Sequence, residues 1–430
     1  MLLTKFGLTA SIWLVVFAAA THMAAQQETT LADFGTATSA GQSPNGIVRD
    51  SAGNLYGTTY GGGLYGAGTV FKVSPTRNGG WMTTYLYSFG SFPGDGGYPY
   101  AGLAMDSSGN LYGVTSQGGG QQCSDGYNDF GCGTVFELSP SGSNGEWTET
   151  ILYNFRRNAK NDGYNPVRGL VLDSAGNLYG TTLYGGASGV SFGGTVFEVR
   201  RSAQGIWNER VLHRFGFGDD GVQPVGPLVL DKSGNLYGVT QDGGGPNTFG
   251  TAFALEHTSS GWKERTLFRF RSESTGENPG SGLIFDSAGN LYGITAPLGT
   301  EQDLSGNVFE LSPTPSGSWK ETVLHSFGPN DPAGYNPETA LTLDSVGNLY
   351  GTTAQGGAGN WGTVFQLQRS DSGLWTETVL HSFPSYGTDG ENPDSALVFG
   401  ANGNLYGTTV YGGTASGENG QNGTVFEIAP

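Results

Sequence analysis

Residues 169–215, GLVLDSAGNLYGTTLYGGASGVSFGGTVFEVRRSAQGIWNERVLHRF, decide the fold of this chain, because their segments recur along the sequence. Four short runs rich in Val, Leu, Thr, Tyr, Phe and Trp alternate with Gly, Ser and Asn, a pattern typical of short strands joined by turns. We name the expected strands a (169–173), b (177–182), c (194–199) and d (207–215). The Asp-Ser-Ala-Gly-Asn sequence between a and b predicts a tight hairpin, since Gly accepts positive φ.

The GNLYG string of strand b occurs seven times, at intervals of 55 to 67 residues. Each copy is followed by a G-[TN]-[VA]-F string, as in strand c, and six copies by a W-x-x-x-x-L-x-x-F string, as in strand d. Four antiparallel strands repeated seven times predict an all-β chain folded as a seven-bladed β-propeller. A β-solenoid fits less well, because its coils repeat at shorter periods and do not hairpin back.

The ends of the chain indicate that the ring is closed. The last repeat contains strands a, b and c but no strand d, whereas residues 28–34, ETTLADF, align with the d segments ETILYNF at 149–155 and ETVLHSF at 321–327. We predict that the N-terminal strand, residues 28–35, pairs with residues 424–428 and completes the last blade. This pairing removes the free edge that an open array of blades exposes.

Residues 1–25 have the features of a signal peptide. Lys5 precedes a short apolar run at 7–20, and small residues follow as far as Ala25, where we expect cleavage. The run is shorter than the roughly 20 residues that a membrane span needs. We therefore predict an exported protein, extracellular or periplasmic, whose mature part is one propeller domain at 26–430 without a membrane span.

The composition excludes several classes of partner. Acidic residues outnumber basic ones by 37 to 19, which gives a net charge of −18. Such an acidic surface repels phosphate backbones, so no nucleic-acid partner is expected. Aromatic residues make up 12% of the chain, which argues against disorder. We expect a monomer.

The run D-S-x-G-N-L-Y-G-T-T, followed by G-T-V-F-x-L, resembles the GloVer-type tandem repeats of bacterial choice-of-anchor proteins. The resemblance covers essentially all of residues 28–430. It implies an exported bacterial protein, often held at the cell surface by a C-terminal anchor. This sequence departs from that pattern, because it ends two residues after the last strand c, which favours release or periplasmic residence. The resemblance supplies no catalytic residues.

Nearly all variation in repeat length falls between strands b and c. These b–c links share one face of an antiparallel propeller with the links between strand d and the next strand a, and insertions confined to one face often mark a binding face. Aromatic side chains of these links could stack on sugars or contact a protein, although the same rings could instead cap the core between blades. The candidate ligand-binding residues are Tyr60, Tyr98, Tyr127, Phe130, Tyr164, Tyr184, Tyr335, Trp361 and Tyr411.

The sequence contains two cysteines, Cys123 and Cys132, and both lie in the longest b–c link. In an exported protein, two cysteines of one link are predicted to form a disulfide. They are too few for a metal site. Calcium would suit an acidic face, because hard cations take oxygen ligands, but no D-x-D-x-D-G loop is present and no cofactor is predicted.

No catalytic residue is predicted. His213, His325 and His381 share a repeat position that Tyr or Phe fills in other blades, which indicates packing. The acidic residues that break the repeat pattern are Asp219, Glu277, Glu301 and Glu391. The sequence favours a secreted, non-catalytic module that binds an extracellular glycan or protein through its b–c and d–a links. The alternatives are a polysaccharide lyase or hydrolase with acidic residues at the channel mouth, and a surface or matrix scaffold.

Overall fold

The computed structural model describes residues 28–35, 40–120, 123, 131–142, 145–157, 162–186, 193–216, 218–271, 278–296, 306–329, 331–384, 389–414 and 422–429. The predicted signal peptide and its cleavage position lie outside these residues. Within the described part of the chain, no helix is long and apolar enough to cross a membrane.

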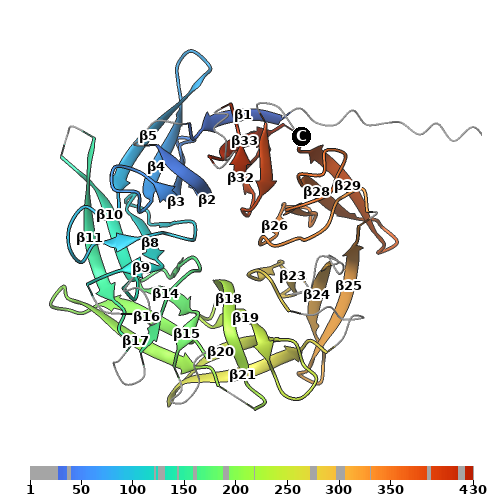
Figure 1. The fold of residues 1–430 in the computed structure, drawn as a ribbon. Helices are drawn as coiled ribbons and strands as arrows, with labels where there is room; N and C mark the ends of the chain where they lie inside the picture. Colours follow the sequence, from blue (N-terminus) through green and yellow to red (C-terminus); the bar gives the residue numbers. More distant parts are fainter. Residues whose placement is uncertain are drawn as a thin grey trace, which may run out of the picture.

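Seven antiparallel sheets surround a central axis in chain order, so the predicted seven-bladed propeller is confirmed (Figure 1). In each sheet, strand a lies nearest the axis and strand d forms the rim. Blade 1 consists of β2 (Gly41–Arg49), β3 (Leu55–Gly62), β4 (Thr69–Pro75) and β5 (Trp81–Ser88). Blade 2 consists of β7 (Ala104–Met105), β8 (Leu111–Thr115), β10 (Thr134–Ser141) and β11 (Glu146–Asn154). Blade 3 consists of β13 (Val171–Leu172), β14 (Leu178–Thr182), β16 (Thr195–Arg201) and β17 (Trp207–Arg214).

The remaining blades repeat this order. Blades 4 to 6 consist of β18 (Gly221–Leu230), β19 (Leu236–Gly243), β20 (Thr251–Thr258) and β21 (Gly261–Arg269); β22 (Ile284–Phe285), β23 (Leu291–Thr295), β24 (Gly306–Pro313) and β25 (Trp319–Phe327); and β26 (Thr342–Leu343), β27 (Leu349–Thr353), β28 (Thr363–Arg369) and β29 (Trp375–Ser382). Blade 7 contains β30 (Gly390–Pro393), β31 (Val398–Phe399), β32 (Leu405–Gly412), β33 (Thr424–Ile428) and β1 (Glu28–Asp33). Two small ladders pair β6 (Gly96–Gly97) with β9 (Gln117–Gly118), and β12 (Gly163–Tyr164) with β15 (Tyr184–Gly185).

The N-terminal strand completes the last blade, as the sequence predicts. β1 runs antiparallel to β33, from Glu28 opposite Ile428 to Asp33 opposite Thr424 (Figure 1). The Phe34 ring, directly after β1, lies 4.8 Å from the Phe71 ring of blade 1. Strand pairing and core packing therefore both join the two ends of the ring.

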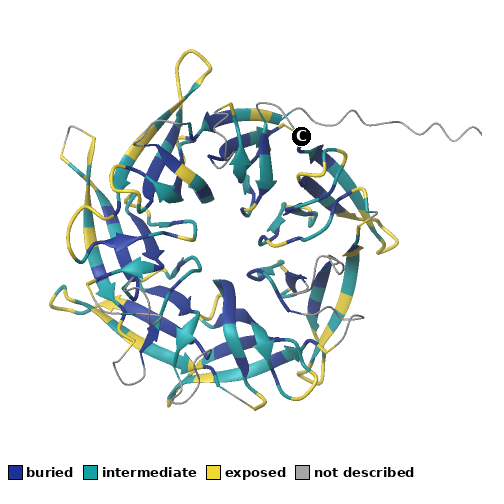
Figure 2. Ribbon diagram, viewed as in Figure 1, coloured by how far each residue is buried: buried dark blue, intermediate teal, exposed yellow. Residues whose placement is uncertain are grey.

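Phenylalanine rings pack each blade against the next. The last Phe of each strand d contacts the Phe of the G-T-V-F string in the following blade, with ring centroids 4.8 to 5.3 Å apart. The second Gly of each GNLYG string lies against the ring of the G-[TN]-[VA]-F Phe in its own blade. At Gly57, for example, an added Cβ atom would approach the Phe71 ring to 2.6 Å. Burial is therefore concentrated on strands b and c, whereas hairpin tips are exposed (Figure 2).

The a–b hairpins explain why D-S-x-G-N-L-Y recurs. In blade 3, Asp173 accepts hydrogen bonds from the backbone N–H and side-chain amide of Asn177, both at 2.8 Å, and from the Tyr179 hydroxyl at 3.1 Å. In blade 7, Gly400 stands in place of the Asp, and Glu427 of β33 accepts the hydrogen bonds of the corresponding Asn and Tyr. The motif therefore serves to fix turns.

The G-x-x-P motif of the d–a links locks neighbouring blades together. In all seven links, the residue before Pro has a φ between 52° and 59°, and four of these residues are Asn, which tolerates this conformation. The Pro ring packs on the Gly of the preceding blade's G-[TN]-[VA]-F string; Pro99 and Gly68 are one such pair, and Pro44 and Gly423 close the ring. A substituent on these glycines would clash with the next blade.

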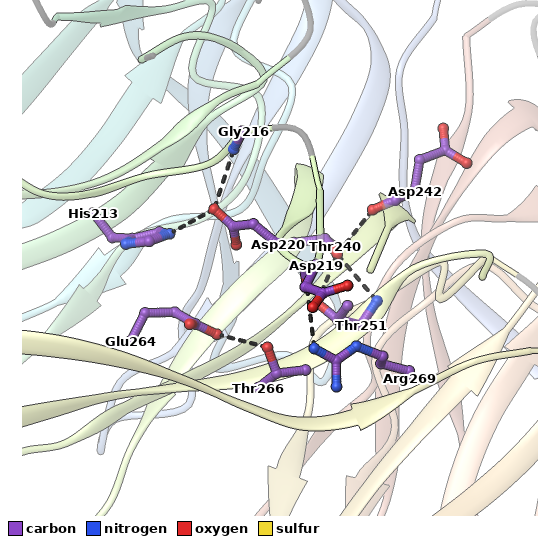
Figure 3. A network of polar contacts seen from close by, with 10 residues as sticks. All are labelled: His213, Gly216, Asp219, Asp220, Thr240, Asp242, Thr251, Glu264, Thr266 and Arg269. Atoms are coloured by element: carbon purple, nitrogen blue, oxygen red, sulfur yellow. Dashed lines mark hydrogen bonds and ion pairs between the residues drawn. The ribbon is translucent and has the colours of Figure 1, made fainter. Parts of the chain in front are cut away.

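The junctions between blades also contain acidic side chains. In five junctions, a Tyr or His of strand d contacts an Asp of the following link: Tyr87–Asp95, Tyr153–Asp162, His213–Asp220, His325–Asp331 and His381–Asp389. The three histidines also pack edge-on against the Phe two residues later. A Glu from strand d of the next blade faces each pair, as Glu264 faces Asp220 and His213 (Figure 3).

Candidate functional site

The cavity on the propeller axis has a volume of about 270 Å³. All seven blades contribute to its wall, through the residues that follow Pro in the d–a links and through the start of strand a. Most of these wall residues are small, such as Gly102, Ser281 and Ala396, and this leaves space at the axis. The cavity is close to the lower end of the size range of small-molecule sites.

Four long side chains stand out from this wall of small residues. Tyr100, Glu338 and Asp394 directly follow the Pro of their links, and Arg168 stands one position later. The first position holds Val or Gly in blades 3, 4 and 5, and the second holds Ala, Gly, Ser or Thr in the blades other than 1 and 3. These four residues, the axial cluster, therefore break the repeat at the axis. Asn45 of blade 1 lines the same cavity.

Charges of opposite sign face one another across the cavity. Blade 3, which carries Arg168, lies across the ring from blades 6 and 7, which carry Glu338 and Asp394 (Figure 1). Burial lowers the pKa of Arg168, and Tyr100, Asp394 and Glu338 oppose this effect electrostatically. Among the described residues, no ion pair within 4.0 Å includes Arg168. The two walls are therefore electrically coupled but separated.

Asp394 holds its proton near neutral pH. The Asp394 side chain is exposed to the cavity, but the surrounding channel wall partly desolvates its carboxyl, and this effect, with the neighbouring Glu338, raises the pKa to about 7 although Arg168 lowers it. Glu338 accepts a hydrogen bond of 2.7 Å from the Asn336 amide. The wall at blades 6 and 7 can therefore accept hydrogen bonds and, through protonated Asp394, donate one.

An aromatic group adjoins the charged wall. The Tyr60 ring, from the end of β3, lies 5.3 Å from the Tyr98 ring and 5.5 Å from the Tyr100 ring. Tyr60 and Tyr98 are half-buried, whereas Tyr100 is 49% exposed. Two predicted tyrosines therefore support a third ring that the sequence analysis does not include and that faces the cavity.

The other predicted aromatic residues are distributed around the same face. Tyr164 and Tyr184 stack at 5.4 Å with their rings inclined by 34°, and the Arg157 guanidinium lies 5.7 Å from the Tyr164 ring. No aromatic ring contact joins Tyr335, Trp361 or Tyr411 to another ring in the described part of the chain. Tyr335 lines a separate surface hollow at the link from blade 5 to blade 6, and Tyr411 lies opposite Glu391 in the β30–β32 pair. Tyr127 and Phe130 lie outside the described residues.

The predicted acidic candidates are not in the axial cavity where the structure describes them. Asp219 is exposed in the link from blade 3 to blade 4, and Glu391 lies in β30. Glu277 and Glu301 lie outside the described residues. Sequence analysis missed Arg168, Glu338 and Asp394, although aligning the seven links on their Pro residues exposes all three as breaks in the pattern.

The predicted disulfide between Cys123 and Cys132 is present. Cys132 is buried beside Phe155 and Val135 in the core between blades 2 and 3. The bond therefore ties the β8–β10 link to the blade core. Within the described residues, no group of three or more His, Cys, Asp or Glu side chains is placed to hold a metal ion.

Reduction of this disulfide should lower the stability of the propeller without unfolding it. Closing a loop of about ten residues stabilises a chain by roughly 2–3 kcal/mol in the loop-entropy model. For a domain of about 400 residues we expect the midpoint of thermal unfolding to fall by about 3 °C in reductant. A Cys123→Ser/Cys132→Ser variant is the control, because it has no disulfide and its midpoint should not respond to reductant. The expectation would be contradicted if reductant left the midpoint of the parent unchanged and the variant unfolded at the same temperature as the parent.

Comparison with known proteins agrees with the fold. No curated protein is significantly similar to this chain. Solved structures that superpose on it include a luciferin-regenerating enzyme (TM-score 0.45, 11% identity, 94% of this chain and 95% of that one) and the periplasmic gluconolactonase of Pseudomonas aeruginosa (0.49, 14%, 87% and 99%). The extracellular domain of a putative hybrid two-component system from B. thetaiotaomicron gives 0.53 at 11% identity, over 94% of this chain and 40% of that one. At 11% identity, the likeness to this extracellular domain shows the fold alone.

The repeat itself identifies the family. The family model described as the Gloeobacter/Verrucomicrobia repeat matches residues 123–345 and 263–430, and together these matches cover more than half of the chain. The resemblance seen in the D-S-x-G-N-L-Y-G-T-T runs is thereby confirmed. The chain belongs to the Gloeobacter/Verrucomicrobia repeat family, and its repeats form the blades of a seven-bladed propeller.

Proposed function

We propose that the protein is an exported, non-catalytic binding module that takes the end of an extracellular glycan into the mouth of its central channel. The observation that carries the proposal is the position of Tyr100 in the wall of the axial cavity. Its half-exposed ring provides an apolar face for a sugar ring, while Glu338 and Asp394 provide hydrogen-bonding groups for hydroxyls. Flat rings combined with a few polar groups are typical of small-molecule sites.

Three further features support this proposal. Tyr60 packs against Tyr100 and is itself packed against Tyr98, so that the Tyr100 ring is ordered before a ligand arrives. The b–c link of blade 1 contacts the d–a link that carries Tyr100, through a hydrogen bond from the Tyr98 N–H to the Ala67 carbonyl, and this places it to contact the rest of a longer glycan. The Cys123–Cys132 disulfide is typical of proteins in oxidising compartments, where such glycans occur.

A glycan array with the exported protein tests the proposal, run with calcium and again with EDTA. We expect a saturable hit whose affinity falls about tenfold in Tyr100→Ala, because loss of an anchoring aromatic ring at a binding site typically costs more than 1 kcal/mol. Tyr65→Ala is the matched control, since Tyr65 is 57% exposed in the β3–β4 link but does not line the cavity. The absence of any hit, or a hit that Tyr100→Ala leaves unchanged, would contradict the proposal.

A polysaccharide-cleaving enzyme is the second candidate, and Asp394 favours it. A carboxyl with a pKa of about 7 beside a second carboxyl is suited to act as a general acid near neutral pH. Incubation of each array hit with the protein, followed by assay of new reducing ends and unsaturated products, separates the two candidates. Turnover that is lost in Asp394→Asn while binding persists would favour the enzyme.

A further inference from the structure

We propose that the channel selects an acidic sugar residue, a uronic acid, whose carboxylate pairs with Arg168 while its hydroxyls contact Glu338 and Asp394. This inference rests on the proposed glycan-binding function and names its ligand class. The protein carries 37 acidic residues and 19 basic ones, so a cation at the axis goes against the general trend of its surface.

The Arg168 side chain lacks a partner among the described residues. Its Nε is buried and makes no hydrogen bond, and no hydrogen bond or ion pair of its guanidinium is formed among the described residues. The Nε has therefore lost its water without compensation, which costs free energy, whereas the Arg168 side chain as a whole is only partly buried and remains open to the cavity that it lines. The guanidinium presents paired donors that match a carboxylate, which is the commonest bidentate partner of Arg.

Arg168 does not simply neutralise the carboxyl groups of the opposite wall. If Arg168 paired closely with Asp394, the carboxyl would be held ionised, with a pKa below its usual value. Instead, the pKa of Asp394 is raised to about 7. No ion pair within 4.0 Å joins Arg168 to Glu338 or Asp394 among the described residues, and all three line the axial cavity, so the two walls act on each other only at a distance.

The size and shape of the axial cavity suit a single sugar residue. A cavity of about 270 Å³ corresponds to roughly nine water molecules, which suits one monosaccharide residue better than a peptide segment. Tyr100 contributes a ring face at the same wall, and the coupling of its hydroxyl to Asp394, Arg168 and Glu338 places it among the charged groups. An anionic end, several hydroxyls and a flat ring face together describe a uronic acid.

Titration calorimetry with methyl glucuronide, methyl glucoside and glycine as probes tests the inference. We expect the exported protein to bind the glucuronide at least tenfold more tightly than the other two, because a charge-assisted hydrogen bond contributes more than a neutral one. Arg168→Met should weaken glucuronide binding about 10- to 100-fold and leave glucoside binding unchanged. Arg168→Lys should recover part of the loss, since it keeps the charge but not the paired donors.

Lys232→Met is the matched control, since it removes one positive charge from an exposed a–b hairpin that does not line the cavity. Thermal unfolding of Arg168→Met and Lys232→Met is measured to check that both variants are folded. Equal binding of glucoside and glucuronide, independent of Arg168, would overturn this inference and leave glycan binding intact. Binding of glycine in place of the sugars would overturn both the uronic-acid inference and the proposed glycan-binding function. If no probe bound, the uronic-acid inference would be overturned, and the glycan array would still decide the glycan-binding function.

Discussion

Replacement of Phe34 by Ala destabilises the propeller by about 3–5 kcal/mol, the cost usual for removing a buried Phe side chain. Phe34 is fully buried and contacts Phe71 across the junction between blade 7 and blade 1. It belongs to a core cluster that also includes Leu31 and Val425, so a cavity there weakens both blades. For a domain of about 400 residues we expect a fall of about 4–6 °C in the midpoint of thermal unfolding.

Deletion of residues 28–35 has a larger effect than the point substitution. It removes all of β1, exposes the edge of β33 and uncovers the core cluster at the ring closure. We expect the truncated protein to lose its cooperative unfolding transition or to self-associate through the free edge. Calorimetry and size-exclusion chromatography measure the two outcomes.

Phe92→Ala is the control for both changes, because Phe92 is 47% exposed in the link after β5. Its replacement should alter the free energy of unfolding by less than about 0.5 kcal/mol. If the deletion variant unfolded at the same temperature as the parent, the N-terminal strand would not close the ring in solution.

We expect the propeller to be most stable near pH 4–4.5 and to lose stability as the pH rises to about 7. Burial raises the pKa of five junction glutamates from 4.5 to about 7, and at four of them a neighbouring aspartate adds to the effect; the five are Glu28, Glu149, Glu209, Glu321 and Glu377. In each case the folded state holds the proton more tightly than the unfolded state. The resulting stabilisation is complete below pH 4.5 and is lost as the pH passes through 7.

Acid below this range acts in the opposite direction. Hydrogen bonds from Asn and Tyr lower the pKa of hairpin aspartates such as Asp50, Asp106 and Asp286, outweighing the effect of burial. The stability that these groups contribute is present above pH 3.8 and is lost as the pH falls through their folded-state pKa. The two sets of carboxyls together place the maximum between them.

Glu149→Gln isolates the effect at one junction. Glu149 faces Asp95, which Tyr87 and Ser91 hold through hydrogen bonds of 2.8 to 3.0 Å, and an amide cannot ionise there. We expect the variant to be about 1 kcal/mol more stable than the parent at pH 8, after allowance for solvent screening at this half-buried group, and equally stable at pH 4.5. Glu146→Gln, exposed on the same strand, is the control. Denaturant unfolding at both pH values gives the comparison, and a variant that tracks the parent at pH 8 would refute the assignment.

The junction between blade 7 and blade 1 lacks all three of these side chains. There, Ala32 replaces the Tyr or His, Ala40 replaces the Asp before the Gly, and Thr83 replaces the Glu. The junction between blade 4 and blade 5 differs, because it keeps Glu321 although Phe268 and Thr275 stand at the other two positions, so the Glu does not depend on the pair. The histidines that the sequence assigns to packing therefore have a second role, because they also contact the junction aspartates.

Repetition made the fold predictable from the sequence. Seven copies of GNLYG and G-[TN]-[VA]-F fix the positions of strands b and c. A Gly beneath a Phe ring and a Pro against a Gly recur in every blade, and the hairpin Asp recurs in six of the seven. The seventh strand d was also visible, because ETTLADF repeats the pattern of other d strands at the other end of the chain. The disulfide followed from two cysteines in one link.

The axial cluster, by contrast, depends on tertiary structure. Tyr100, Arg168, Glu338 and Asp394 are separated by 56 to 294 residues, and each looks like an ordinary link residue by itself. Closure of the ring brings the four link positions to one axis, where partial desolvation and the neighbouring Glu338 raise the pKa of Asp394. The sequence by itself determined the blades, because their contacts repeat at a fixed period. Only the closed ring decided which charged side chains face one another, because their distance and hydration depend on all seven blades together.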